Sequence, residues 1–237
     1  METALKDALK KYKPRKIRRA YIWQIQNNMY GTLDLNKDAI KKLGILSFNP
    51  LLGVGDEQVE TLFWKLTGSD KIYSYTPTIG NNLSKIMGIN RPADWSRLET
   101  SPLLVNDWLF RSTMTDEEVR DYADGFIKDI ITYGIPWIQS HADRQEMLKE
   151  LLAYQPPYSQ FNRFSIPVLY LALGRKEDAI DYAKNQLKEM KILRHFGVYE
   201  SIDEVDKTKI FPEEWKPRYP QVMIDEYEKF VEKVIKY

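Results

Sequence analysis

Two glycines one residue apart, Gly53 and Gly55, follow an apolar run and precede a helical pattern, which is where a phosphate-binding loop would lie. A dinucleotide-binding fingerprint needs a third glycine three residues after the second, and a P-loop needs Gly-Lys-Ser/Thr. The sequence contains neither of these motifs at this position. Asp56 and Glu57 also put negative charge at the start of the helix, where it would repel a phosphate. The residues therefore predict a tight strand-to-helix turn with an acidic first helical turn, and no cofactor is expected.

The helix that follows, at residues 56–66, has one face that could bind a partner. Its apolar residues recur at helical spacing and mark the face that we expect to lie on the core. The candidate partner-binding residues lie away from that stripe and are Glu57, Glu60, Thr61 and Trp64. Acidic residues beside a tryptophan favour a basic protein partner, because tryptophans often anchor interfaces. The competing interpretation is that the helical C-terminal half of the chain covers Trp64 as part of the core.

A basic segment lies near the N-terminus, where residues 6–19 hold eight Lys and Arg residues against one Asp. Lys and Arg side chains interleaved with tyrosine are typical of nucleic-acid-binding surfaces. The candidate nucleic-acid contacts are Lys10, Lys11, Lys13, Arg15 and Lys16. The formal net charge of the whole chain is only +1. We therefore favour the interpretation that these basic residues are solvent-exposed side chains of a helix and of the segment before the first strand. Nucleic-acid binding is kept as the second alternative function.

Catalytic and metal-ligating side chains are sparse. The chain has no cysteine, and its two histidines, His141 and His195, have no second histidine at helical spacing. The run S-H-A-D at residues 140–143 is not a triad, because adjacent side chains point in different directions. We expect Ser140 to cap the next helix instead. No catalytic set and no metal site are predicted, and the first alternative function is a hydrolase-like enzyme with dispersed carboxylates, His141 and tyrosines in a cleft between two halves.

The composition is that of an ordinary globular protein, with 237 residues, 43% apolar and 29% charged. The N-terminus lacks the apolar core of a signal peptide. The longest apolar run, at residues 166–173, is far shorter than the roughly 20 residues of a membrane span. We therefore expect a cytoplasmic protein without a membrane segment.

The pattern of elements predicts an α+β protein. Residues 20–26 alternate between apolar and polar, residues 27–31 hold turn formers, and residues 32–36 alternate again, which indicates a strand hairpin. Residues 43–52 read as a third strand, and Thr115 with Glu118 forms a capping box before a helix. We expect an N-terminal antiparallel sheet with packed helices in a domain at 1–154. A mostly helical C-terminal part at 155–237 would follow, with the boundary in Q-P-P-Y-S-Q at 155–160.

Two stretches resemble known families. L-Y-L-A-L-G-R-K-E-D-A-I-D-Y-A at 169–183 resembles the middle of one tetratricopeptide repeat, with Gly174 at the turn and Ala179 and Ala183 on the second helix. Because a stable array needs at least three repeats, we expect a single helical hairpin here. A second resemblance is to uncharacterised bacterial families of unknown function, some of which are encoded near toxin–immunity loci. It rests on the order of three features: the strand hairpin, then F-N-P-L-L-G-V-G, then G-I-P-W-I-Q-S. That resemblance supplies no catalytic residues. Together with the lack of a nucleophile, metal or cofactor motif in the sequence, it leads us to expect a non-enzymatic cytoplasmic protein-interaction or immunity-type protein.

Overall fold

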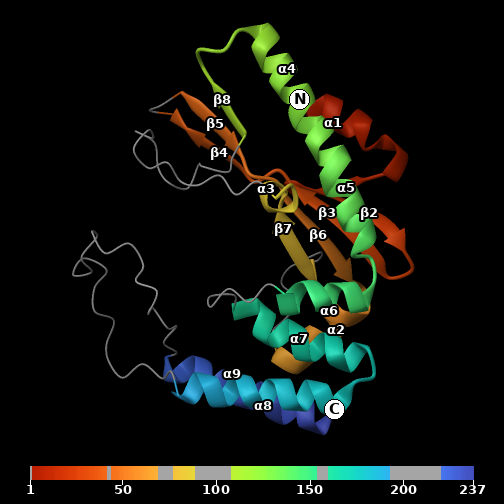
Figure 1. The fold of residues 1–237 in the computed structure, drawn as a ribbon, viewed down its shortest axis with the longest axis vertical. Helices are drawn as coiled ribbons and strands as arrows, with labels where there is room; N and C mark the ends of the chain where they lie inside the picture. Colours follow the sequence, from red (N-terminus) through yellow and green to blue (C-terminus); the bar gives the residue numbers. More distant parts are fainter. Residues whose placement is uncertain (1, 42–43, 69–76, 89–107, 154–159, 193–219) are drawn as a thin grey trace, which may run out of the picture. The chain divides into compact units, whose positions relative to one another are not determined.

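The computed structural model describes residues 2–41, 44–68, 77–88, 108–153, 160–192 and 220–237 (Figure 1). The chain divides into two compact units. Unit 1 comprises Met1–Glu60 and Tyr73–Met147, and unit 2 comprises Thr61–Ile72 and Leu148–Tyr237. The chain passes from unit 1 to unit 2 within helix α2 (Glu57–Thr67) and returns to unit 1 at Tyr73. It passes to unit 2 a second time within α6 (Arg144–Ala153). Apart from residue 160, the predicted boundary segment 155–160 lies outside the described residues.

A five-stranded antiparallel sheet forms the main part of unit 1, in the order β1-β2-β3-β6-β7. Its strands are β1 (Arg15–Ile17), β2 (Ala20–Gln26), β3 (Met29–Asp34), β6 (Leu51–Asp56) and β7 (Ile79–Asn82). Two residues join β2 to β3, and the second of them, Asn28, has a left-handed φ of 60°. This conformation is typical of the tight turns that match the twist of paired strands. The predicted strand hairpin is confirmed.

The glycine pair lies inside strand β6, so the expected tight turn at Gly53 and Gly55 is wrong. Both glycines leave room for bulky groups that lie across the strand. A Cβ on Gly55 would overlap the ring of Tyr30 on β3, and one on Gly53 would lie 2.5 Å from the Cβ of Pro77. Large side chains that cover glycines in neighbouring strands are a known way of packing a sheet. The expected acidic helix start is present, because α2 begins at Glu57 directly after the strand.

A second, three-stranded antiparallel sheet has the order β4-β5-β8, with β4 (Lys37–Ile40), β5 (Ile45–Phe48) and β8 (Trp108–Arg111). The expected single strand at 43–52 is therefore wrong, because β5 and β6 belong to different sheets. Asn49 and Pro50 separate them. Proline has no backbone N–H to donate to a ladder, so neither sheet continues through this corner.

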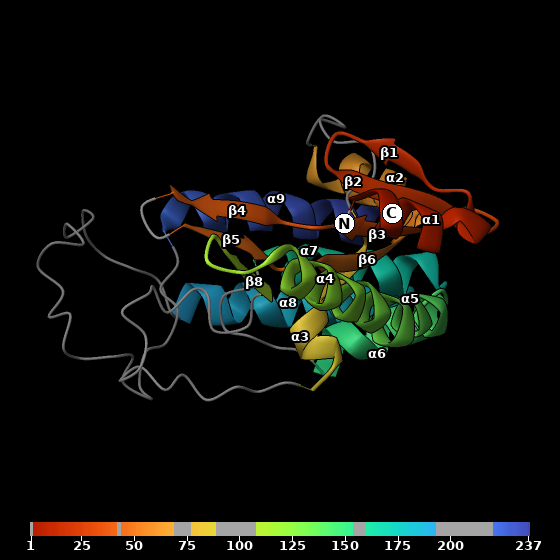
Figure 2. The same cartoon turned by 90° about the horizontal axis from the view of Figure 1, so that it is seen from above.

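Helices cover the strands of unit 1. They are α1 (Glu2–Ala8), the 3-10 helix η1 (Lys10–Tyr12), α3 (Leu83–Ile86), α4 (Asp116–Asp129), the π-helical η4 (Ile130–Gly134) and α5 (Ile135–Ser140). The predicted capping box of Thr115 and Glu118 is confirmed at the start of α4. Figures 1 and 2 show the α4–α5 run along one face of the five-stranded sheet, and α5 contacts β6. Phe126 of α4 packs on Phe48 and Trp108 of the smaller sheet.

Unit 2 is helical, which completes the predicted α+β class with a helical C-terminal part. Its complete helices are α7 (Gln160–Ala172), α8 (Lys176–Ile192) and α9 (Gln221–Lys236). The predicted helical hairpin is confirmed, with Gly174 at a φ of +73° in the turn and with Ala179 and Ala183 fully buried. In its core, Phe164 packs on Tyr227 and Phe230. No helix within the described ranges is both long and apolar enough to cross a membrane.

Candidate functional site

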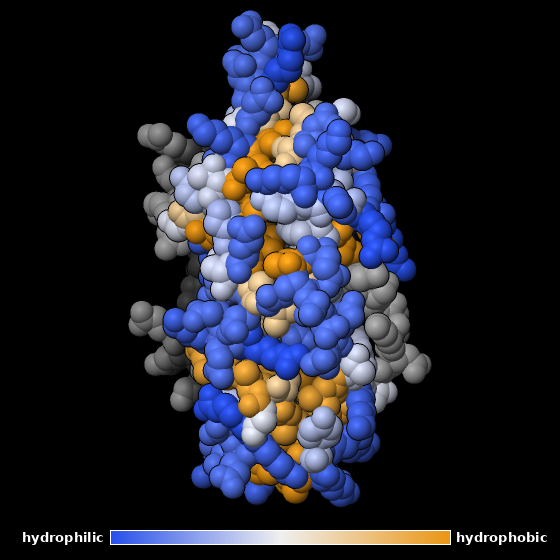
Figure 3. Space-filling view, turned by 90° about the vertical axis from the view of Figure 1, so that its right-hand side faces the viewer, coloured by the Kyte–Doolittle hydropathy of each residue, from blue (hydrophilic) through white to orange (hydrophobic). Residues whose placement is uncertain are grey.

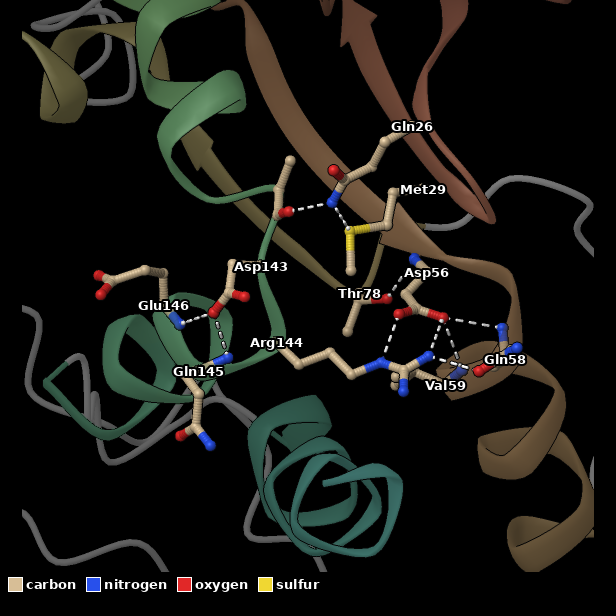
Figure 4. Close-up of polar contacts among 11 residues, drawn as sticks. Gln26, Met29, Asp56, Gln58, Val59, Thr78, Asp143, Arg144, Gln145 and Glu146 are labelled. Carbon is tan, nitrogen blue, oxygen red and sulfur yellow. Dashed lines mark hydrogen bonds and ion pairs between the residues drawn. The ribbon is translucent and has the colours of Figure 1, made fainter. Parts of the chain in front are cut away.

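A polar cluster in unit 1 surrounds Asp56, the last residue of β6 (Figure 4). The Asp56 side chain is completely buried. Its Oδ1 accepts hydrogen bonds from the backbone N–H groups of Gln58 and Val59, at 2.9 and 3.2 Å. The first turn of a helix leaves such N–H groups without partners inside the helix. Asp56 therefore caps α2, and it does so from the end of a sheet strand.

The guanidinium of Arg144, the first residue of α6, lies against the same carboxylate. Its Nε donates to Oδ2 of Asp56 at 2.7 Å and its Nη2 donates to Oδ1 at 3.2 Å. Nη2 also donates to Oε1 of Gln58 at 2.6 Å. Two-pronged contacts of this kind are stronger and more specific in geometry than single ones. The cluster therefore ties the first turn of α2 to the first turn of α6.

This geometry limits what the Asp56 carboxylate can do chemically. It accepts hydrogen bonds from four protein donors, and a carboxylate has about four acceptor positions. Three of these bonds are to Oδ1 and one is to Oδ2, and the side chain is completely buried, so neither oxygen faces solvent. No group of three or more His, Asp or Glu side chains in the described part of the chain is arranged to hold a metal ion. The cluster is best understood as a device that positions two helices.

Glu60 is only 8% exposed, so its expected place on the exposed partner-binding face is wrong. Its Oε1 accepts a buried hydrogen bond from the hydroxyl of Tyr30. The Tyr30 ring reaches this position because it crosses Gly55, which has no side chain. A buried carboxylate needs such a donor, since burying a charge without a partner is strongly unfavourable. The contact with β3 thus explains why Glu60 turns inward.

The other three candidate partner-binding residues lie differently. Glu57 and Thr61 are exposed, whereas Trp64 is only half exposed. The Trp64 ring packs edge-on against Phe63, with ring centroids 5.2 Å apart. Its Nε1 is buried and has no hydrogen-bond acceptor among the described residues. The exposed acidic and aromatic face is therefore smaller than expected, and its role in partner binding stays a prediction.

All eight cationic side chains of residues 6–19 are exposed, and together they define what we call the basic surface. They are Lys6, Lys10, Lys11, Lys13, Arg15, Lys16, Arg18 and Arg19. They come from α1, η1, β1 and the residues that link these elements to β2. Lys11 Nζ lies over the ring of Tyr12 at 4.9 Å, and Arg19 pairs with Asp34 at 2.8 Å. Of the five candidate nucleic-acid contacts, Arg15 and Lys16 lie on the edge strand β1, Lys10 and Lys11 lie on η1, and Lys13 follows η1 directly.

The S-H-A-D run ends one helix and starts the next. Ser140 is the last residue of α5, and its hydroxyl donates to the carbonyl oxygen of Trp137 at 2.9 Å. The cap of α6 is Asp143, whose Oδ1 accepts from two backbone N–H groups, so the expected capping role of Ser140 is wrong. The ring of His141 stacks on Trp137 with centroids 4.5 Å apart. His195 lies outside the described residues, and the enzyme alternative stays a prediction.

Two partners of the buried carboxylates of unit 1 were not predicted. Arg144 binds Asp56 from 88 positions away in the chain, and nothing local in the sequence indicates such a pair. Tyr30, the partner of Glu60, carries a weak signal. Alternating glycines inside a strand favour an aromatic residue on the neighbouring strand, because its ring fills the missing side-chain volume. That pattern, applied to β3 and β6, points to Tyr30.

Comparison of the chain with protein-family models, with curated proteins and with solved structures gives no match.

Proposed function

We propose that this protein is a non-enzymatic interaction protein that binds an anionic partner through the basic surface. The observation that carries the proposal is the exposure of all eight cationic side chains within residues 6–19. The formal net charge of the whole chain is +1, so the remaining sequence is acidic overall. Such a separation of charge creates a local positive field that attracts anions and orients them.

The placement of the cations also supports the proposal. Arg15 and Lys16 lie on β1, which pairs with β2 through a three-residue antiparallel register. The five-stranded sheet thus holds the backbone of this edge in place. Charged side chains on a fixed frame lose less conformational freedom when they bind than the same side chains on a loose tail.

The acidic and aromatic face of α2 supports a protein partner less strongly. The burial of Glu60 removes one of its two carboxylates from the surface, and Trp64 is half covered. A basic partner would then meet mainly Glu57 and Thr61. The resemblance to families near toxin–immunity loci stays a prediction. A cytoplasmic location is part of the proposal, because the cysteine-free composition favours a reducing compartment.

The test removes charge from the basic surface without changing the length of the side chains greatly. The variant exchanges five residues for Gln: Lys10, Lys11, Lys13, Arg15 and Lys16. A matched control exchanges five exposed lysines of unit 2 for Gln: Lys176, Lys184, Lys188, Lys229 and Lys236. Both variants lower the net charge by the same amount. Binding to fluorescent poly-glutamate and to fluorescent duplex DNA is measured by anisotropy, and circular dichroism verifies that each variant is folded.

We expect the wild-type protein and the control variant to bind at least one of the two polyanions, and the basic-surface variant to bind it at least about tenfold more weakly. Equal binding by the two variants would show that total charge, and not this surface, attracts the anion. Absence of binding by the wild-type protein at low salt would overturn the proposal.

A further inference from the structure

We infer that the partner of the basic surface is the phosphate backbone of duplex nucleic acid, bound without preference for base sequence. The inference rests on the proposed function, since it names the anion that the same surface binds. It follows from three features of the described residues: the spacing of the cations, the burial of the neighbouring aromatic rings, and the form of the sheet edge.

The cations are closely spaced along the chain. Arg15, Lys16, Arg18 and Arg19 fall within five consecutive positions, the first two on β1 and the last two in the tight turn that leads into β2. Duplex DNA carries one negative charge per about 1.7 Å of helix axis, so cations this close together in the chain meet a dense row of phosphates. Each phosphate that a Lys or Arg neutralises also releases condensed counterions. This entropic gain is available from a duplex to a much greater extent than from an ordinary acidic protein surface.

The aromatic rings beside the basic surface are not free to stack on bases. Tyr21 and Trp23 are only 3% and 4% exposed. The half-exposed ring of Tyr12 lies 5.9 Å from the Trp23 ring, and Lys11 Nζ lies over it. Binding of single strands relies on exposed aromatic side chains on which successive bases stack. The structure therefore favours a duplex, whose bases are already stacked on one another, over a single strand.

The sheet edge at β1 is poorly suited to an acidic peptide that adds as a further strand. The strand is three residues long and follows Pro14, which has no N–H to donate. Lys13 and Arg18, on either side of the strand, have left-handed φ values of 51° and 57°. Short edges with proline, charge and irregular backbone are typical of strands that resist pairing. Recognition therefore rests on side chains, which is how proteins contact a phosphate backbone.

Figure 3 faces the side of the molecule on which Figure 1 draws α1 and the β2 hairpin. Hydrophilic side chains cover most of the upper part of this face, on both sides of an apolar strip. Unit 1 thus presents a largely polar surface here, as expected of a surface that contacts a hydrated, charged backbone.

The experiment compares three probes on the full-length protein: a labelled duplex of about 20 base pairs, one of its strands alone, and poly-glutamate of similar charge. Each is titrated at several salt concentrations between about 50 and 200 mM. If the five residues Lys10, Lys11, Lys13, Arg15 and Lys16 each contact a phosphate, the log–log salt slope for the duplex is about −4.5. Duplex affinity then falls about 500-fold over this fourfold range of salt.

We expect the duplex to bind more tightly than the single strand and the peptide, and two duplexes of unrelated sequence to bind within about twofold of each other. The basic-surface variant should show a slope less steep by about 4.5, because each of the five lost phosphate contacts removes about 0.9. The matched lysine control of unit 2 should keep the wild-type slope. Tighter binding of poly-glutamate or of the single strand would overturn this inference and leave the proposed function standing. Binding of none of the three probes would overturn both.

Discussion

The exchange Asp56→Asn tests whether the polar cluster holds the starts of α2 and α6 together. The substitution keeps the size of the side chain and removes its charge. If the amide oxygen takes the place of Oδ1, it still accepts from the N–H groups of Gln58 and Val59. The amide nitrogen then faces Nε of Arg144, at a position where Oδ2 accepted a hydrogen bond at 2.7 Å. Two donors would meet there, and the Arg144 guanidinium would lose its counter-charge.

The expected loss of stability follows from this geometry. Removing one partner of a buried ion pair costs about 3–5 kcal/mol, because the remaining charge is left without compensation. The Arg144 side chain is 24% exposed and the Asp56 side chain 0%. Water therefore reaches Arg144 in part, and Asn retains the helix cap, so the lower end of that range applies. We predict that Asp56→Asn lowers the free energy of unfolding by about 3 kcal/mol.

The assay is urea unfolding followed by far-UV circular dichroism and by tryptophan fluorescence, to which Trp23 and Trp137 of unit 1 contribute. The matched control is Asp143→Asn at the exposed cap of α6, where Asn caps as well as Asp and a change within about 0.5 kcal/mol is expected. A double-mutant cycle with Arg144→Gln should give a coupling energy of at least about 1 kcal/mol. Equal stability of the two Asp→Asn variants, or a coupling energy near zero, would refute the reasoning.

Two further predictions concern the cores of the two units. Gly55→Ala should lower the free energy of unfolding by about 2–3 kcal/mol, because its Cβ would overlap Tyr30 and displace the hydroxyl that donates to Glu60. Gly125→Ala is the control in urea unfolding, since no neighbouring atom lies within 4 Å of the position of its Cβ; an equal loss of stability in both variants would contradict the explanation. In unit 2, burial raises the pKa of Tyr182 to about 12 from an ordinary value of about 10. The neutral phenol therefore contributes stability that is complete below pH 10 and is lost as the pH rises towards 12, so Tyr182→Phe should reduce the fall in Tm between about pH 8 and 11. If Tm falls equally with pH in the Phe variant and in the wild-type protein, this contribution of Tyr182 to stability is excluded.

Features that depend on short stretches of chain could be predicted from the sequence. The β2–β3 hairpin has turn formers between two alternating segments, the α4 cap has Thr115 and Glu118 at the right spacing, and Gly174 permits the left-handed turn between α7 and α8. In each case the residues that determine the structure lie within a few positions of one another. The helical hairpin was therefore predictable without any knowledge of what packs on it.

Features that depend on distant pairing could not be predicted. The helical wheel places Glu60 on the outer face of α2, but the phenol of Tyr30 on another strand holds it inside. The glycines of β6 indicate a turn when they are considered alone, and only the rings that cross them explain a strand. The buried charge of Asp56 depends on Arg144, far along the chain. Local patterns give the propensity of a segment, while the partner that satisfies a buried polar group is set by the tertiary fold.

The corner at Asn49 and Pro50 has a consequence for the order in which unit 1 folds. On one side of the corner, β6 pairs with β3 through partners as close as Asp34 and Leu51. On the other side, β5 pairs with β8 through Phe48 and Trp108, about 60 residues apart. Closing the longer loop costs about 1 kcal/mol more in chain entropy, and such non-local pairing is slow to form. The five-stranded sheet is therefore expected to form first. Strand β8 then pairs with β5 late in folding, and this pairing completes the core around Phe48.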